Sequence, residues 1–148
     1  MATLVVDSYE GQDVVIFDVP GAYLNANMPD EKDVRLDLQG EFMDIMCNLN
    51  TDHIPNIWYE NGKKVIYLRI LKALYEYIEW ALIWYDQYSN NLKESAFTIN
   101  PYDRSVANKI INEKQYTIWW YAGNNKVSHV DTKVNTIIIE GIANVLGI

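Results

Sequence analysis

The chain has 148 residues, of which 49% are hydrophobic, and its formal net charge is −8. This length suits a single domain over residues 1–148 with a sizeable core, and the apolar content is too high for a disordered chain. Proteins that bind nucleic acid strongly neutralise its phosphates with Lys and Arg. An acidic chain without a basic run therefore argues against strong binding to nucleic acid.

The sequence contains no run of about 18 apolar residues, the length that begins to span a bilayer. Its start, MATLVVDSYE, lacks the basic segment and the long apolar stretch of a secretory signal. We therefore expect an intracellular protein without a membrane partner. The single cysteine, Cys47, excludes an internal disulfide, and we expect a buried or half-buried thiol. His53 and His129 have no second metal ligand at a suitable spacing, so we expect ordinary surface or hairpin histidines.

The first half of the chain predicts short elements. Residues 13–19 are rich in β-branched side chains and predict a buried strand, which Pro20 and Gly21 end. An Asn-Gly pair at residues 61 and 62 lies between two β-prone runs and predicts a hairpin, since both residues tolerate positive φ. The expected elements are strands over 13–19 and 34–38, a helical turn over 22–27, a helix over 41–49, and hairpin strands over 57–59 and 64–68.

Residues 70–96 form the longest periodic stretch and predict a long helix. Trp80 and Trp84 lie one turn apart on another flank, so the helix is expected to be buried on more than one side. Its main apolar face is predicted to comprise Leu71, Leu74, Tyr75, Ile78, Leu82, Tyr85 and Leu92.

The last part of the chain predicts hairpin strands followed by a helix. Strands over 105–111 and 115–121 form one hairpin, and a second turn follows over 123–125. Trp119 and Trp120 are adjacent in a strand and therefore face opposite sides of the sheet. Asp131 or Thr132 is expected to cap a last helix through about Leu146. The order of elements predicts an α+β fold, with an antiparallel sheet and helices packed on one face.

Several blocks in a fixed order carry a resemblance to a known family. They are FDVPGAYLNANMP, YLRILKALYEYIEWALIWYDQY, NPYDRSVANK and the strand-turn-strand at Tyr121. Together they resemble the reverse transcriptase of copia-type (pseudoviral) retrotransposons over about Asp13 to Asp131, which is most of the chain. The resemblance implies a polymerase-palm-like domain with a ferredoxin-like core.

The resemblance also implies where a polymerase site would lie. In that family, Phe-Asp-Val carries the first metal-binding aspartate, which corresponds to Asp18. Tyr23 corresponds to the aromatic residue under the sugar of the incoming nucleotide, and Tyr121 begins the turn that the family writes as Tyr-Val-Asp-Asp. The family's aspartates hold Mg²⁺, and in this chain Gly123 and Asn124 stand in place of the two turn aspartates.

These replacements remove most of the implied metal site. Nucleotidyl transfer uses two divalent ions, and Mg²⁺ prefers carboxylate and phosphate oxygens. Asp18 leaves one strong ligand, Asn124 offers a neutral amide oxygen, and Gly123 has no side chain. Glu76 stands where the family usually has Gly, and the family's fingers, thumb and next palm strand have no counterpart in this sequence. We therefore expect no polymerase activity, no resident cofactor and only weak metal binding at Asp18.

Three classes of function stay open. The first is a catalytically inactive palm-like domain with a structural or interaction role, or an engineered stable fold. The second is a residual RNA-directed DNA polymerase fragment, or a module that binds nucleic acid or a nucleotide. The third is a small-ligand binder with an aromatic cleft near Tyr23, Tyr121 and the long helix. We also expect self-association, because a palm without its next strand leaves an unpaired edge that invites pairing.

Overall fold

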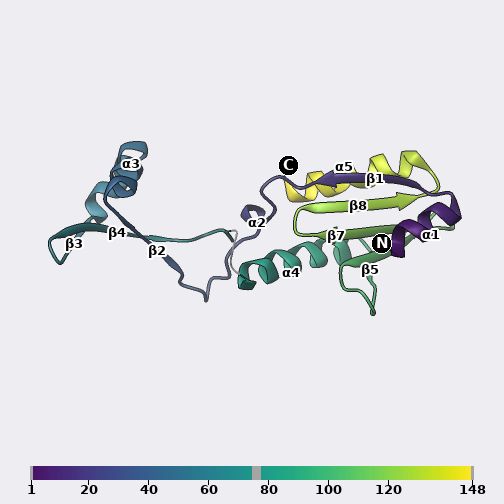
Figure 1. Ribbon diagram of the computed structural model, residues 1–148, viewed down its shortest axis with the longest axis horizontal. Helices are drawn as coiled ribbons and strands as arrows, with labels where there is room; N and C mark the ends of the chain where they lie inside the picture. Colours follow the sequence, from purple (N-terminus) through teal and green to yellow (C-terminus); the bar gives the residue numbers. More distant parts are fainter. Residues whose placement is uncertain (1, 75–77, 148) are drawn as a thin grey trace. The chain divides into compact units, whose positions relative to one another are not determined.

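The computed structural model describes residues 2–74 and 78–147 (Figure 1). The chain divides into two compact units, one formed by Met1–Ala26 with Ala73–Ile148 and the other by Asn27–Lys72. The second unit is therefore an insertion within the first along the chain. The sequence predicts one domain over residues 1–148 and does not predict a division into two units. Helices combine with antiparallel strands in both units, which confirms the α+β fold class.

A five-stranded antiparallel sheet forms the centre of the first unit, in the spatial order β1-β8-β7-β6-β5. The β6–β7 and β7–β8 hairpins confirm the two predicted hairpins. The short strand β5, which the sequence does not predict, and β1 lie at the two edges. The strands are β1 (Asp13–Asp18), β5 (Thr98–Ile99), β6 (Val106–Ile111), β7 (Lys114–Tyr121) and β8 (Asn124–His129).

Helices lie on both faces of this sheet. Asn125 and Lys126 are neighbours on β8, so their side chains point to opposite faces. Asn125 accepts a hydrogen bond from Tyr88 of α4, whereas Lys126 pairs with Asp7 of α1. Helices α4 and α5 line a common cavity and share one face, as predicted, and α1, which the sequence does not predict, covers the other (Figure 1). The helices of this unit are α1 (Ala2–Glu10), α2 (Ala22–Asn25), α4 (Ile78–Glu94) and α5 (Thr132–Leu146).

The long helix predicted over residues 70–96 is shorter in the structure. α4 spans Ile78–Glu94, and Lys72 forms a β-bridge with Asn27 instead of a helical turn. Tyr75 and Glu76 lie outside the described residues. The helical periodicity of the sequence therefore begins before the helix does. It includes Lys72, which pairs with Asn27, a residue from a distant part of the chain.

Aromatic side chains form the buried side of α4. Trp84 stacks on Tyr88 with ring centroids 5.2 Å apart, and Tyr88 meets Trp120 of β7 edge-to-face at 5.5 Å. Ile78 and Leu82, which the periodicity places on the buried face, are 90% and 58% exposed. That part of the prediction is wrong, because large rings spaced four residues apart bury more apolar area than the smaller side chains and so face the sheet.

Three single-residue expectations have different outcomes. Trp119 is half-buried and Trp120 buried, on opposite faces of β7, as predicted. Cys47 is a buried free thiol, as expected. His129 lies in the hairpin strand β8, but it is only 1% exposed, and its ring centroid is 5.9 Å from that of Tyr116. It is not a surface residue, because the alternation of β8 directs it to the same face as Asn125, which α4 and α5 cover.

Helix α5 has the ends that its sequence predicts. The carboxylate of Asp131 accepts a hydrogen bond of 3.0 Å from the backbone N–H of Lys133, which satisfies a donor of the first turn. Gly147 adopts a left-handed backbone with φ of 73° and ends the helix.

The second unit is a three-stranded antiparallel sheet of order β2-β4-β3 with two short helices. Its small core comprises Met43, Cys47 and Ile66. Asn61 and Gly62 have φ values of 50° and 78° and confirm the predicted hairpin turn. The elements are β2 (Arg35–Gln39), α3 (Glu41–Leu49), the 3₁₀ helix η1 (Thr51–Asn56), β3 (Trp58–Glu60) and β4 (Lys63–Arg69).

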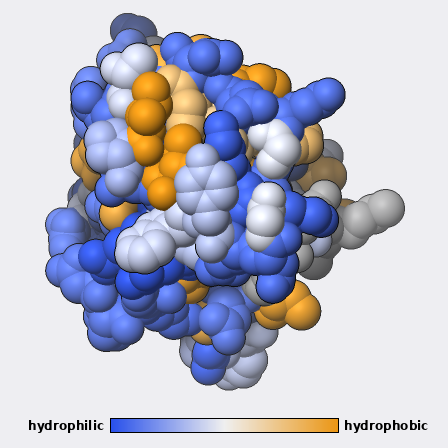
Figure 2. All heavy atoms as spheres, turned by 90° about the vertical axis from the view of Figure 1, so that its left-hand side faces the viewer, coloured by the Kyte–Doolittle hydropathy of each residue, from blue (hydrophilic) through white to orange (hydrophobic). Residues whose placement is uncertain are grey.

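Large apolar side chains stay exposed on the second unit. Phe42 and Tyr59 are each 72% exposed. Figure 2 views the side on which α3 and β3 are drawn in Figure 1, and shows orange hydrophobic side chains gathered among blue hydrophilic ones. The exposed apolar residues of this unit include Phe42, Ile45, Leu49, Ile54, Trp58 and Tyr59.

Candidate functional site

The turn between β7 and β8 consists of Ala122 and Gly123, because Tyr121 pairs with Asn124. Ala122 has a left-handed backbone with φ of 52°, whereas Gly123 does not. The sequence predicts this turn over residues 123–125, so the turn begins one residue earlier than predicted and residue 125 lies within β8. The glycine at residue 123 is therefore explained by close packing and not by a positive φ.

Gly123 lies against the end of β1. A Cβ at this position would be 2.9 Å from Oδ1 of Asp18, 2.9 Å from the backbone oxygen of Val19 and 3.3 Å from Cβ of Ala22. The carboxylate of Asp18 could rotate away, but the oxygen of Val19 belongs to the backbone. A side chain at residue 123 therefore requires the end of β1 to move.

Hydrogen bonds fix the glycine of this turn. The carbonyl oxygen of Gly123 accepts from the backbone N–H of Val19 at 2.8 Å and from Nδ2 of Asn125 at 2.7 Å. Oδ1 of Asn125 in turn accepts from the hydroxyl of Tyr88 at 2.7 Å. Asn125 and Tyr88 are each 1% exposed, so α4 holds the turn through a buried amide.

A second bond joins α4 to the turn. Nε1 of Trp84 donates to the carbonyl oxygen of Ala122 at 2.8 Å. The sequence reasoning did not identify Trp84, Tyr88 or Asn125 as anchors of the turn. The sequence offers no clear signal for these anchors, because β8 reads NNKVSH and Asn125 is one of several polar residues in it.

Burial raises the pKa of the Tyr88 hydroxyl well above its ordinary value. The phenol is therefore neutral at physiological pH and can donate its proton to Oδ1 of Asn125. The carbonyl oxygen of Gly123 can only accept, so Nδ2 of Asn125 points to the turn and Oδ1 is left to accept from Tyr88. The network is structural in character, since its members bond to one another.

The predicted site residues gather at this end of the sheet. Asp18 lies opposite Asn124, and Asn124 lies opposite Tyr121, so the three side chains share one face. Asp18 and Asn124 are exposed, and Tyr121 is 71% exposed. Gly123 is next to them in the turn. Tyr23 comes from α2 and lines the cleft described below.

The donor set at the turn does not fit a two-ion Mg²⁺ site. Asp18 supplies a carboxylate, Asn124 carries a neutral amide, and packing leaves no room for a side chain at Gly123. Within residues 2–74 and 78–147, no group of three His, Cys, Asp or Glu side chains could hold a metal ion. Two ions held at catalytic separation need several charged oxygen ligands. The turn therefore lacks most of the ligands that such a site needs.

An aromatic cleft lies beside the turn. Its volume is about 190 Å³. Tyr85 and Trp120 form part of its wall and stack at a centroid distance of 6.0 Å. Tyr23 and Tyr121, the two predicted nucleotide-binding residues, both line it. The lining residues are Tyr23, Ala81, Trp84, Tyr85, Ser105, Trp120, Tyr121 and Ala122.

The size of the aromatic cleft limits what it can hold. Pockets that enclose a drug-sized ligand have volumes of roughly 300–1,000 Å³. At about 190 Å³, the aromatic cleft suits one planar ring with the remainder of the ligand outside. Aromatic walls favour such a ring through stacking. If the ring is a nucleobase, stacking does not distinguish one base from another.

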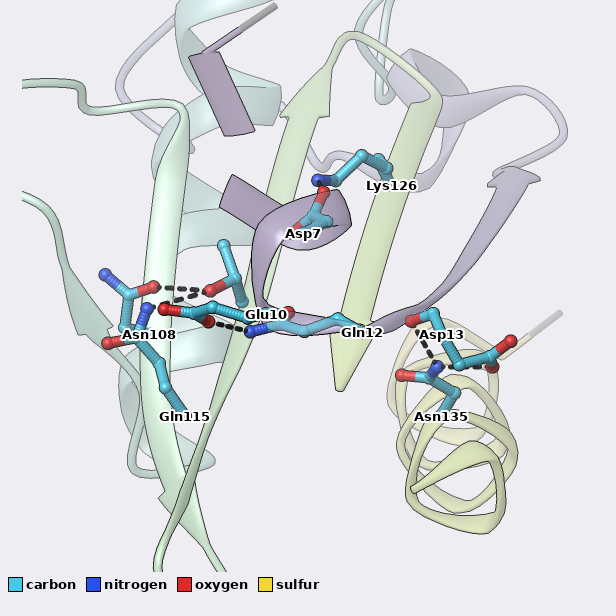
Figure 3. Close-up of polar contacts among 9 residues, drawn as sticks. Asp7, Glu10, Gln12, Asp13, Asn108, Gln115, Lys126 and Asn135 are labelled. Atoms are coloured by element: carbon cyan, nitrogen blue, oxygen red, sulfur yellow. Dashed lines mark hydrogen bonds and ion pairs between the residues drawn. The ribbon is translucent and has the colours of Figure 1, made fainter. Parts of the chain in front are cut away.

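A second cavity of about 190 Å³ lies between α1 and the sheet, and its lining includes Asp7, Gln12, Asn108, Gln115 and Thr117. Figure 3 shows Asp7 of α1 directed at Lys126 of β8 and Gln12 bonded to Glu10. The hydroxyl of Thr117 donates to Oδ1 of Asn108 at 3.0 Å. The pair of Asp7 and Lys126 joins α1 to the sheet, whereas the bond between Thr117 and Asn108 joins β7 to β6.

Among the described residues, no helix is both long enough and apolar enough to cross a membrane. Comparison with known proteins finds no match: no protein-family model, no curated protein and no solved structure is similar to this chain.

Proposed function

We propose that this chain is a reverse-transcriptase-palm-like domain that does not polymerise nucleotides and acts by binding other molecules. The observation that carries the proposal is the position of Asp18 against Gly123. The family resemblance pairs these two positions in one metal site, and the structure has Oδ1 of Asp18 2.9 Å from where a Cβ of residue 123 would lie.

The strand order of the first unit supports the palm-like part of the proposal. β1 is followed by helix α4, the hairpin strands β7 and β8, and then helix α5, with β8 between β1 and β7. This is the order expected for the first five elements of a β-α-β-β-α-β unit, in which the third strand lies beside the first. The strands β5 and β6 and the second unit are additions to that pattern.

The absence of polymerase activity follows from the ligands at the turn. In-line displacement needs charge stabilisation on both the attacking and the leaving oxygen, which two metal ions normally supply. Asp18 gives one carboxylate there, and the amide of Asn124 has no charge. The chain's own groups at this turn can position a ligand but do not supply that charge.

Primer extension tests the catalytic part directly. The chain is incubated with a primer annealed to a template, deoxynucleotides and either Mg²⁺ or Mn²⁺, and the expected result is no extension. Template-directed extension above a blank without protein, and lost in Asp18→Asn, would overturn the proposal. The Asp18→Asn control separates activity of this chain from a contaminating polymerase.

Paramagnetic broadening tests the palm-like part. Mn²⁺ is titrated into the isotope-labelled chain and into Gly123→Asp/Asn124→Asp, and NMR signals near Asp18 are followed. Broadening at Asp18 and the turn in the double variant alone supports a palm whose metal site has been lost. Localised broadening in the unmodified chain would contradict the proposal that the metal site has been lost. No localised broadening in either protein, with the fold of both verified, overturns the palm resemblance at this turn.

The interaction role is supported by exposed apolar surface. Monomeric soluble proteins rarely expose large contiguous apolar patches. The second unit exposes Phe42, Trp58 and Tyr59 by about two thirds or more, at 72%, 66% and 72%. In the first unit, Ile16 of the edge strand β1 is 74% exposed. We therefore propose protein association, including self-association, as the binding role.

A second candidate function is the binding of a nucleotide or another planar small molecule. The observation that favours it is the aromatic cleft, which both Tyr23 and Tyr121 line. Trp84 and Trp120 belong to its wall, so a ring stacked there changes their fluorescence. The test titrates ATP and a deoxynucleotide into Trp58→Phe, which removes the emission of the exposed tryptophan of the second unit. Saturable quenching that Tyr23→Ala abolishes supports this function, and a linear response equal in both proteins contradicts it.

A further inference from the structure

The outer edge of β1 has backbone groups available for pairing. The N–H of Val19 donates to the oxygen of Gly123 at 2.8 Å, so these two residues lie at a hydrogen-bonded position at the end of the β1–β8 ladder. Such bonded pairs alternate along an antiparallel ladder. Phe17, Val15 and Asp13 therefore bond to β8, and the residues between them direct their N–H and C=O groups outward. Those residues are Val14, Ile16 and Asp18.

The two edges of the sheet differ in how they are protected. Natural edge strands are commonly shielded by short length, Lys, Pro or bulges. β5 has only two residues, and Lys109 of the neighbouring β6 donates to the oxygen of Ser95. β1 pairs along its whole length of six residues without a bulge and contains neither Lys nor Pro. Ile16 is 74% exposed at its centre.

We propose that the outer edge of β1 pairs antiparallel with β1 of a second copy of this chain, with Ile16 opposite Ile16 on a two-fold axis. This inference rests on the interaction role proposed above and names its partner. The pairing would join two five-stranded sheets into one continuous sheet.

Backbone geometry selects this alignment. The outward groups belong to even-numbered residues, so an even-numbered residue of one copy must face an even-numbered residue of the other. An alignment with Asp13 opposite Asp18 is excluded on this ground. An axis through Val15 would place Gln12 opposite Asp18, but the N–H of Gln12 is already bonded to the oxygen of Asp7 at 2.8 Å.

An axis through Phe17 would place Val14 opposite Pro20, which has no N–H to donate. The alignment with Ile16 on the axis uses every outward group of β1. Ile16 faces Ile16, and Val14 of each copy faces Asp18 of the other. Each pair exchanges two backbone hydrogen bonds. No carboxylate lies directly opposite another, so the like-charge penalty between cross-strand neighbours is avoided.

Net charge opposes the association at long range. Each chain carries −8, so two copies repel one another, and salt screens that repulsion. The interface itself is built from backbone bonds and apolar contact, which salt leaves intact. The dimer is therefore expected to strengthen as the salt concentration rises, whereas an interface held by ion pairs would weaken.

Sedimentation velocity measures the association of the full chain at increasing concentration and at low and high salt. The expected result is a concentration-dependent dimer that high salt favours. A chain that stays monomeric up to about 1 mM, near the weak end of the affinity scale, overturns the inference. Such a monomer leaves the primer-extension result untouched, so failure here is distinguishable from failure of the catalytic part of the proposed function.

Two matched substitutions locate the interface. Ile16→Lys places two lysines opposite each other on the axis. Ile110→Lys makes the same change at another exposed isoleucine of the same sheet, which is 67% exposed on β6. Ile16→Lys is expected to weaken dimerisation by at least about tenfold, and Ile110→Lys to leave it unchanged. Both residues are exposed, so circular dichroism is expected to show native folding. Loss of the dimer only in Ile110→Lys assigns the interface to the opposite edge and overturns the inference.

Disulfide trapping tests the alignment. Cys47 is the single cysteine, so Cys47→Ser gives a background without thiols. Ile16→Cys in that background is expected to form a cross-linked dimer on mild oxidation, since Cα atoms of a bonded pair lie about 5.5 Å apart, within disulfide reach. Val14→Cys faces Asp18 of the other copy and is expected not to cross-link. Cross-linking of Val14→Cys in preference to Ile16→Cys overturns the proposed alignment.

Discussion

The carboxylate of Asp18 lies directly against the backbone of Gly123, with Oδ1 2.9 Å from the position that a Cβ of residue 123 would take. The oxygen of Val19 is equally close to that position. Gly123 has no left-handed backbone, so its lack of a side chain serves close packing of the β7–β8 turn on the end of β1.

Gly123→Ala is expected to lower the free energy of unfolding by about 1–3 kcal/mol, because the added methyl group displaces the end of β1. Urea unfolding measures the change. Gly141→Ala is the control, since Gly141 lies within α5 and no atom is within 4 Å of its added Cβ. It is expected to stabilise the protein by about 0.5–1 kcal/mol. Equal stability of Gly123→Ala and the unmodified chain would contradict the packing described for the turn.

Tyr88→Phe is expected to destabilise the protein by about 1–3 kcal/mol, because it leaves Oδ1 of the buried Asn125 without its donor. Tyr85→Phe is the matched control on the same helix. The hydroxyl of Tyr85 donates to the oxygen of Arg104 at an exposed site, where water can replace it. Urea unfolding of both variants gives the comparison. A loss in Tyr85→Phe as large as that in Tyr88→Phe would show that the buried amide is not the critical acceptor.

The ion pair between Asp7 and Lys126 is nearly excluded from solvent, since the two residues are 3% and 5% exposed. Asp7→Ala is expected to cost about 3–5 kcal/mol, because it leaves the charge of Lys126 buried without a partner. The double variant Asp7→Leu/Lys126→Met removes both charges and is expected to lose much less stability. Thermal and urea unfolding measure the cycle of Asp7→Leu, Lys126→Met and the double variant. A loss in the double variant equal to the sum of the two single losses would indicate that the pair is open to water.

Alkaline pH is expected to destabilise the protein. Burial raises the pKa of Tyr88 and of Tyr116 above the ordinary value of 10.0, and for Tyr116 the neighbouring Tyr88 adds to the effect. The folded state therefore holds these phenol protons more tightly than the unfolded state does. Stability from this source is complete below about pH 10 and falls as the pH rises further, where only the unfolded state releases protons.

Urea unfolding at several pH values from about 9 to 11, with tyrosinate absorbance recorded in parallel, measures this fall. Tyr88→Phe is expected to show a shallower decline than the unmodified chain. Tyr121→Phe, at a site that is 71% exposed, is expected to keep the original slope. Stability that stays constant over this range would show that these hydroxyls ionise as readily in the folded protein as in the unfolded one.

The turns and helix ends that local chemistry specifies were predictable from the sequence. Asn61 and Gly62 tolerate positive φ, so they form the β3–β4 turn whatever surrounds them. Asp131 caps α5 because its short side chain reaches a backbone donor two residues away. The candidate site was predictable in part: Asp18, Gly123 and Asn124 do meet at the turn, and Tyr23 lines the aromatic cleft with Tyr121.

Features that depend on distant partners were not predictable. The long helix begins later than its period suggests, because Lys72 pairs with Asn27. The buried side of α4 is the one with Trp84 and Tyr88, since these rings meet Trp120 of the sheet. The position of α1 depends on the pair between Asp7 and Lys126, which are 119 residues apart.

The sequence by itself determined the strands other than the two-residue β5, the hairpins and the α+β class, because alternation, turn residues and caps act over a few neighbouring positions. Only the tertiary structure decided which face of α4 is buried, how the second unit is inserted, and how close Asp18 comes to Gly123. Those outcomes depend on the area that each packing buries and on the partners of buried polar groups, and both are set by residues that meet only when the chain has folded.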